Sequence, residues 1–351
     1  MQFGKQNHFL IFLFSYFLIF IVSLVAALRD FSIGKDTYTY VRIFNNFVEG
    51  HWLQRLEPGF LFLLLMVEFI YSDPRFFLFI VTFLITVFYF IFFYKSTRAL
   101  NLNFNQQFCY LILFFSLLFF SSWYFNAFSN GIRQGLSLVL LYLGLYSLVA
   151  LKSKTNFLIL YLFSASFHYS SIAILPFLLF YALPLTYLLI VWVVIAILYP
   201  LGVNELIVTA MSDLSGVGVY DFIKNYSLDS AGESGDYSGF NLSFFLYTVF
   251  WPLFLFFIQK LRMSGENEVL RLGQLLIKIY ILLSLPYFVF GFGPYSNRFA
   301  VMAWFFIPMI QLLIFASFRF KLNFPFLISL IFLFFFSLIF LVTYRLELFS
   351  H

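Results

Sequence analysis

The sequence predicts an all-α, polytopic transmembrane helix bundle of about 10–12 spans. Of the 351 residues, 63% are hydrophobic and only 10% are charged, whereas soluble domains carry about a quarter charged residues. Apolar runs long enough to span a bilayer recur along the chain, and backbone groups surrounded by lipid are satisfied within helices. We therefore expect residues 1–351 to form a single integral membrane domain.

Two irregular apolar segments predict a cavity. Residues 59–71 are too few to span, which indicates a partial or re-entrant helix. Residues 157–203 must cross the membrane an odd number of times, and a break at His168 would give three short crossings. Short or re-entrant helices persist only against protein or along a water-filled cavity, so we expect them to line one. The expected segments are 9–28, 59–71, 76–94, 106–122, 131–149, 157–181, 185–203, 241–259, 273–290, 299–316 and 325–343.

The charges of the connections orient the bundle, because cytoplasmic loops carry an excess of Lys and Arg. The loop at 204–240 has six acidic residues and one basic residue, and the loop at 29–58 has four of each, so we place both outside. The predicted cavity then faces outward. The connections expected in the cytoplasm are Lys95/Arg98, Lys152/Lys154, Lys260/Arg262/Arg271 and Arg319/Lys321.

The external loop at 29–58 contains a predicted amphipathic helix. Asp36 or Thr37 would cap this helix and Gly50 would end it. We expect it to lie at the outer membrane surface. Spacings of three and four place one set of apolar side chains on a single face: Tyr40, Ile43, Phe44 and Phe47.

Arg133 and Arg298 are the two candidate anion-binding residues. Charged groups at membrane depth are rare and usually face a cavity or a partner. Arg133 shares its helix start with Asn126 and Asn130, and such a start favours an anion. The planar guanidinium suits phosphate oxygens. Arg298, in "GPYSNRF", repeats this pattern, and the alternative for both arginines is a role at the membrane interface.

His168 and three carboxylates are further candidate residues, and His168 and the two aspartates could move or orient a proton. A histidine at a helix break can act as base or acid near neutral pH, although a packed histidine is the alternative. Asp30, beside Arg29, and Asp36 could orient a sugar hydroxyl at the cavity rim, or could simply belong to a solvated loop. Glu57 precedes Pro58, and a favourable helix start explains this pair without any function.

Motifs for nucleotides or metals do not stand out in this sequence. We find no nucleotide-binding or hydrolase motif in a supporting context, and the single cysteine, Cys109, has no metal-ligand spacing around it. We therefore expect no cofactor, no metal and no nucleic-acid partner.

Four motifs, in order, resemble the EpsG-like branch of Wzy-type polysaccharide polymerases. They are "LRDFSIGKDTYTYVRIF…EPGF", "SNGIRQGLSLVLLYLGLYSL", "FLILYLFSASFHYSSIAILP" and "NRFAVMAWFFIP". One departure is Lys35, where the family more usually has Thr before the aspartate. The acidic loop and the "EPGF" start also resemble GT-C glycosyltransferases, which implies a GT-C-like bundle.

The resemblance implies polymerisation of O-antigen or capsule repeat units at the outer face of the bacterial plasma (inner) membrane. The implied partners are an undecaprenyl-diphosphate-linked oligosaccharide, membrane lipid and a chain-length regulator. On this hypothesis Arg133 and Arg298 hold the diphosphate, and His168 or Asp36 accepts the proton of the acceptor hydroxyl. The further residues expected to contact substrate are Arg29, Asp30, Tyr40, Asn130 and Glu57.

Two alternatives come from other classes. A lipid-linked oligosaccharide flippase would need polar groups near mid-membrane, whereas the candidates here cluster toward the outside. A GT-C enzyme that adds one sugar from a polyprenyl phosphate would give a single product rather than a ladder of sizes.

Overall fold

The computed structural model describes residues 2–34, 36–51, 56–216, 218, 220, 240–262, 268–292 and 296–317, and within these residues the regular structure is helical. Among these residues, six helices are long and apolar enough to cross a membrane, and the number rises to eight if each of two bent pairs forms one span. The predicted polytopic helix bundle is therefore confirmed, although several of the expected apolar segments are short or broken. The predicted helix at 325–343 lies outside the described residues, as do Arg319 and Lys321.

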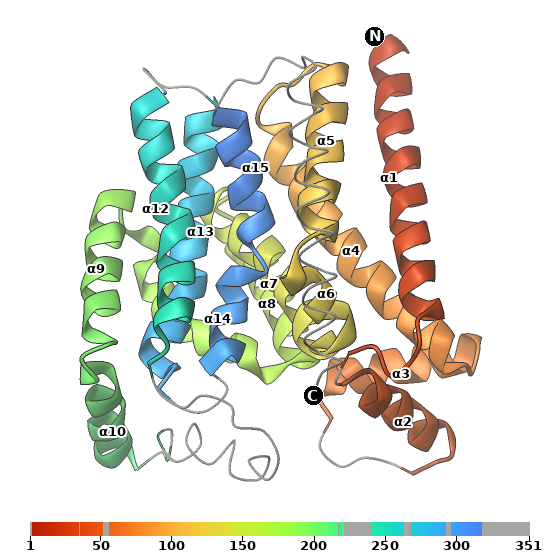
Figure 1. The fold of residues 1–351 in the computed structure, drawn as a ribbon, viewed down its shortest axis with the longest axis horizontal. Coiled ribbons are helices and arrows are strands. Elements are labelled where there is room, and N and C mark those ends of the chain that lie inside the picture. The colour runs from red at the N-terminus through yellow and green to blue at the C-terminus, as the bar shows by residue number, and fades with distance from the viewer. Residues whose placement is uncertain are drawn as a thin grey trace. The chain divides into compact units, whose positions relative to one another are not determined.

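The described residues form two compact units, one up to Ser171 and the other over Ile172–Ser317. In the first unit, α7 (Ile132–Val149) is buried along almost its whole length and packs against α4 (Pro74–Arg98), α6 (Ser122–Ser129) and α8 (Lys154–Phe167). The helix α1 (Gln2–Leu28) packs along α4 and also contacts α5 (Phe104–Phe119). The antiparallel pairs α1/α4 and α7/α8 place the end of α1 and the start of α7 at the same end of this unit (Figure 1).

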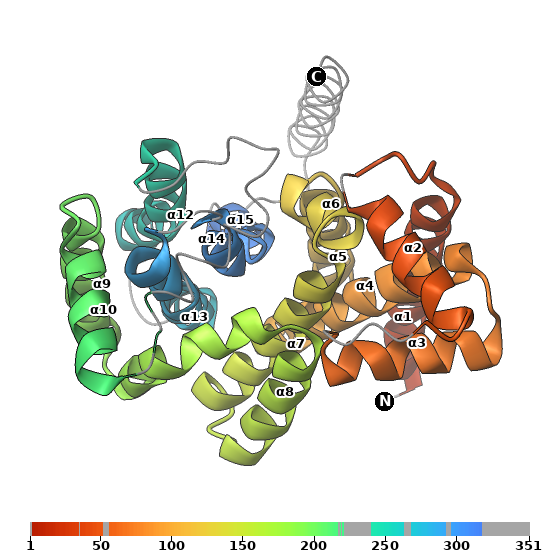
Figure 2. The ribbon, with the colours of Figure 1, turned by 90° about the horizontal axis from the view of Figure 1, so that it is seen from below.

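The predicted short helix at residues 59–71 is α3 (Pro58–Ile70), which at 13 residues is below the length that a span requires. It starts at Pro58, whose fixed φ suits a first helical turn. Together with α2 (Thr37–Val48), it lies across the end of the first unit, as Figure 2 shows. Phe60 and Leu64 of α3 are completely buried, whereas Phe69 is exposed, so only one side of the helix faces protein.

The predicted amphipathic helix is α2, and its apolar face packs against protein. Phe44 stacks on Phe77 of α4 with ring centroids 5.3 Å apart, and Tyr40 meets Phe60 of α3 at 6.1 Å. Asp36 occupies the N-cap position but makes no side-chain capping hydrogen bond. Helices α3 and α4 therefore cover the apolar face of α2.

The predicted break at His168 is confirmed. The helix α8 ends at Phe167, His168 is extended with φ −160° and ψ 125°, and the chain continues as the 3₁₀ helix η1 (Tyr169–Ala182). Pro176 lies inside η1, and a proline lacks the N–H that a regular α-helix would need there. The segment predicted as 106–122 also bends, by 64°, between α5 and α6.

In the second unit, α13 (Glu268–Phe290) is the central helix. It packs against α9 (Leu185–Leu198), α10 (Val203–Ser215), α12 (Leu242–Arg262), α14 (Ser296–Trp304) and α15 (Ile307–Ser317). Two indole N–H groups join helices of this unit, each at 2.8 Å. Trp192 of α9 donates to the Ser284 hydroxyl of α13, and Trp304 of α14 donates to the Thr248 hydroxyl of α12.

Two segments of the second unit differ from the expectation. The acidic loop predicted at 204–240 begins as the helix α10, which follows α9 after a 92° bend at Gly202, and residues 221–239 lie outside the described part. Gly202 has φ +71°, a conformation that glycine adopts without strain. The segment 299–316 is divided at Phe305 and Phe306, because Pro308 has no N–H to continue the helix from α14.

Candidate active site

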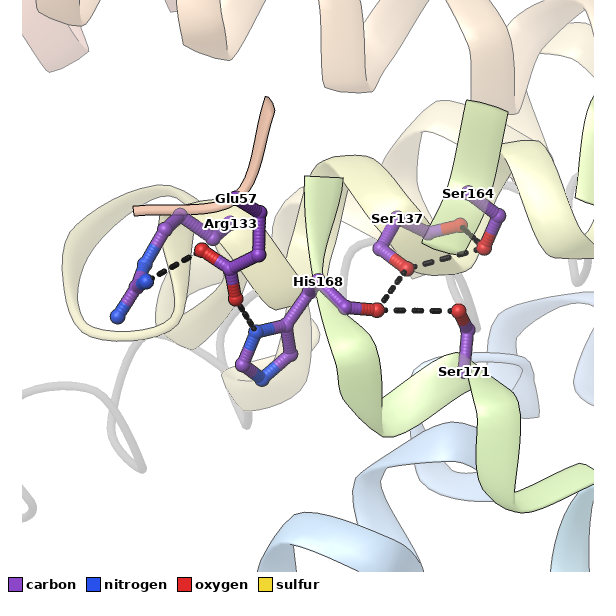
Figure 3. A network of polar contacts seen from close by, with 6 residues as sticks. All are labelled: Glu57, Arg133, Ser137, Ser164, His168 and Ser171. Carbon is purple, nitrogen blue, oxygen red and sulfur yellow. Dashed lines mark hydrogen bonds and ion pairs between the residues drawn. The ribbon is translucent and has the colours of Figure 1, made fainter. Parts of the chain in front are cut away.

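The carboxylate of Glu57 joins an arginine and a histidine at one end of the first unit. Its Oε2 lies 2.5 Å from Nη1 of Arg133, and its Oε1 lies 2.8 Å from Nδ1 of His168 (Figure 3). The Glu57 side chain is only 4% exposed, so water screens these contacts weakly. Three segments therefore meet at this carboxylate: the start of α3, the start of α7 and the end of α8.

The local backbone leaves both carboxylate oxygens of Glu57 available. Glu57 is the N-cap residue of α3, with extended φ −65° and ψ 143°, but its side chain makes no capping hydrogen bond. A favourable helix start explains the position of Glu57 and Pro58, as expected. It does not explain the carboxylate itself, which binds side chains of two other helices.

Gly59 allows α3 to approach α8 closely enough for these contacts. A β-carbon at Gly59 would clash with the Ser166 side chain and would lie 2.9 Å from the Ser166 backbone carbonyl. Any larger residue would therefore push the start of α3 away from the end of α8. Because His168 follows Ser166 by two residues, this contact also sets the distance between Glu57 and the imidazole.

Arg133 is held from several sides by other side chains. Its guanidinium carbon lies 5.8 Å from the centre of the Phe60 ring, and Tyr40 interacts with the same guanidinium. The side chain remains 26% exposed. Its Nε is buried and has no hydrogen-bond partner among the described residues. The guanidinium thus keeps donor capacity that Glu57 does not use.

The imidazole of His168 is oriented through Nδ1, and its backbone carbonyl is held by serines. Ser171 donates to the carbonyl at 3.0 Å, and the Ser137 hydroxyl lies 3.5 Å from it (Figure 3). Ser164 in turn donates to the Ser137 carbonyl at 2.8 Å. Nε2 of His168 has no hydrogen bond to any residue that the structure describes. The ring is 14% exposed, so Nε2 is the nitrogen left for a ligand.

Ser137 and Ser164 were not identified from the sequence, although a signal was present. Ser137 follows Arg133 by four residues on α7, and Ser164 precedes His168 by four on α8. Residues four apart share one face of a helix, so Ser137 lies on the same side of α7 as Arg133.

Electrostatics keep the carboxylate of Glu57 ionised. Burial raises the pKa of Glu57, but the hydrogen bond from His168 and the charge of Arg133 outweigh it and lower this pKa to about 2. In α2, burial raises the pKa of the Tyr40 phenol, which the nearby Arg133 guanidinium partly offsets. The cluster therefore presents a fixed anion between a permanent cation and an imidazole.

Arg29, Asp30 and Asp36 lie outside this cluster. Arg29 donates to the carbonyls of Ala26 and Phe128 and to the Thr37 hydroxyl, and burial lowers its pKa to about 10. Asp30 accepts from the backbone and hydroxyl of Ser32 in a local turn, while Asp36 is exposed at the start of α2. Arg29 thus fastens the end of α1 to α2 and α6.

Asn130 lies at the end of α6, and Arg298 lies on α14. Asn130 donates to the Asn126 side chain at 3.0 Å, and its own Oδ1 is buried without a hydrogen-bond partner among the described residues. Arg298 is partly buried on α14, in the second unit. Within the described part, no three His, Cys, Asp or Glu side chains gather so as to hold a metal ion.

The six or more long apolar helices indicate a multi-pass membrane protein, and the cluster gives this bundle an imidazole, a carboxylate and a guanidinium in direct contact. The family model described as the EpsG family matches residues 12–349, so the chain belongs to that family. Comparisons with curated proteins and with solved structures gave no match.

Proposed function

We propose that this protein is a membrane-embedded glycosyltransferase that polymerises polysaccharide repeat units carried on undecaprenyl diphosphate. The observation that carries the proposal is the bridge that Glu57 makes between Arg133 and His168. It joins an anion-binding group and an oriented base, the two functions that transfer from a glycosyl diphosphate requires. Membership of the EpsG family supports a polysaccharide-related activity.

Arg133 is proposed to bind the diphosphate of the donor. When the bond from the sugar to the diphosphate breaks, negative charge grows on the departing oxygen, and a preformed cation stabilises this charge. The guanidinium is suited to the task because Phe60 and Tyr40 fix its position, and because Nε remains unpaired within the described part. Arginine–phosphate contacts are frequently bidentate, which adds orientation to attraction.

His168 is proposed to take the proton of the acceptor hydroxyl. With Nδ1–H donated to Glu57, Nε2 carries the free electron pair of the neutral imidazole. The acceptor oxygen then forms a bond to the anomeric carbon as the bond to the diphosphate breaks, and the hydroxyl proton moves to Nε2. The energy of the glycosyl–diphosphate bond drives the transfer, so no cofactor is needed.

The charges at the two ends of the first unit support an outward-facing site. The basic connections at Lys95/Arg98 and Lys152/Lys154 lie at the end opposite to Glu57, Arg133 and His168. The positive-inside rule assigns that basic end to the cytoplasm. The cluster would then face the outer leaflet of the bacterial plasma membrane, where lipid-linked repeat units and a chain-length regulator would meet it.

Complementation of a deletion strain tests the proposal. The wild-type gene is expected to restore a ladder of surface glycan, whereas Arg133→Gln and His168→Asn should leave single repeat units at the surface. Matched controls are Arg42→Gln and His51→Asn, since both side chains are exposed. A full ladder from either cluster variant would overturn the proposal. Repeat units trapped inside the deletion strain would indicate that the protein is a flippase. A product with a single added sugar would indicate a simple transferase.

A further inference from the structure

In the structure, Glu57 is paired with the Arg133 guanidinium, which is the group that the proposed function assigns to binding of the diphosphate. A guanidinium has five N–H donors, and Glu57 contacts Nη1 at 2.5 Å. A diphosphate that approaches Arg133 must therefore either share the guanidinium with Glu57 or displace this carboxylate. The Glu57 side chain is almost completely buried, so this is not a solvent-exposed surface ion pair.

Displacement is feasible because Glu57 has a second partner. Removing one partner from a buried ion pair normally leaves an uncompensated charge, which is strongly destabilising. Here Oε1 keeps its 2.8 Å contact with Nδ1 of His168 when Oε2 loses Arg133. Once Nε2 has taken the acceptor proton, the imidazolium supplies the positive charge that balances the carboxylate. Release of Arg133 and protonation of His168 would therefore favour each other.

We propose that Glu57 is a positioning residue that exchanges partners during the reaction. It holds Arg133 and His168 together in the empty site, yields Arg133 to the diphosphate of the donor, and stays with His168 while the proton is transferred. Glu57 thus weakens the binding of the donor and strengthens catalysis. This inference rests on the proposed function, because it assumes that a diphosphate binds Arg133.

Glu57→Gln separates this role from a merely structural one. The amide keeps the shape of the side chain but competes less well with the diphosphate for the Arg133 guanidinium. Undecaprenyl diphosphate should therefore bind about tenfold more tightly. This is the change expected if the fraction of protein with Arg133 free to bind the diphosphate rises from about a tenth to nearly all. The same amide orients His168 less well, so kcat should fall. The expected signature is a lower KM for the donor together with a lower kcat.

Purified protein in lipid nanodiscs, titrated with undecaprenyl diphosphate, gives the affinity. Glu68→Gln is the matched control, since Glu68 lies on the same helix and makes no ion pair or hydrogen bond among the described residues. Weaker binding by Glu57→Gln would overturn the inference while leaving the proposed function intact. If the wild type binds undecaprenyl diphosphate no better than Arg133→Gln does, the proposed function itself fails.

Infrared difference spectra of the wild type give a second readout that needs no folded Glu57 variant. Addition of undecaprenyl diphosphate should shift a carboxylate stretching band, because Glu57 changes partners. The same band should shift in Glu68→Gln and stay unchanged in Arg133→Gln. Binding of undecaprenyl diphosphate to the wild type without any carboxylate shift would overturn the exchange.

Discussion

Gly59 and Ser166 are packed so closely that only a hydrogen atom fits on the Gly59 Cα on the side facing α8. This contact fixes the start of α3 against the last turn of α8, and it thereby holds the Glu57 carboxylate within 2.8 Å of the His168 imidazole. The position of the Glu57 carboxylate, which the proposed chemistry uses, thus depends on the absence of a side chain at Gly59.

Gly59→Ala should therefore reduce polymerisation while the protein still inserts. The added methyl group overpacks the α3–α8 contact, at a cost of about 1–3 kcal/mol, and displaces Glu57. Gly144→Ala is the control, because a β-carbon there would meet Leu160 of α8 at an ordinary 3.4 Å. Polymer length and protein level in membranes are the measurements. Equal activity of the two variants would show that close packing at Gly59 does not position the site.

Arg29→Lys should lower stability without changing the affinity for a diphosphate. The Arg29 guanidinium donates to Phe128 and Thr37, which lie on two other helices, and a lysine cannot reproduce this fork. Loss of these contacts should cost about 2 kcal/mol and lower the melting temperature in detergent. A weaker Kd for undecaprenyl diphosphate at unchanged melting temperature would instead indicate that Arg29 binds substrate.

Tyr40→Phe should weaken binding of undecaprenyl diphosphate about fivefold, the equivalent of one hydrogen bond of about 1 kcal/mol. The Tyr40 hydroxyl interacts with the Arg133 guanidinium from a buried position, so its removal leaves Arg133 less firmly held. Tyr38→Phe is the matched control, because Tyr38 is exposed on the same helix. Similar dissociation constants for both variants and the wild type would exclude this role for Tyr40.

The depressed pKa of Glu57 predicts how its contribution to stability depends on pH. The ordinary value is 4.5 and the folded value is about 2, so the unfolded chain binds the proton first as the pH falls. The stabilisation is complete above about pH 4.5 and is lost toward about pH 2. The difference in melting temperature between wild type and Glu57→Gln should therefore be smaller at pH 3 than at pH 5.

Glu68→Gln, a substitution on the same helix, is the matched control for folding and yield. A difference between wild type and Glu57→Gln that grows on acidification would contradict the assigned direction of the pKa shift.

Local sequence patterns predicted the helix breaks and faces well. The run at 59–71 was visibly short, His168 interrupted an apolar segment, and the spacing of Tyr40, Phe44 and Phe47 defined the buried face of α2. The division at Phe305 was not anticipated, although Pro308 marks it. These features depend on residues within one or two turns of each other, which periodicity reports directly.

The contacts that build the cluster depend on separations that periodicity does not report. Glu57 is 76 residues from Arg133 and 111 from His168, so no local pattern indicates that its carboxylate binds these two side chains rather than its own helix. Arg29 likewise reaches the carbonyl of Phe128, 99 residues away, and was grouped with substrate contacts because it adjoins Asp30. Tertiary packing, and not local preference, decides the role of these polar groups.

Elongation by purified protein in nanodiscs tests the central claim most directly. Given undecaprenyl-diphosphate-linked repeat units, the wild type should produce a ladder of polymers. His168→Asn should slow elongation by about 10²–10⁴-fold, the usual contribution of a general base, while still binding undecaprenyl diphosphate. A ladder of wild-type length and rate from His168→Asn would contradict the account.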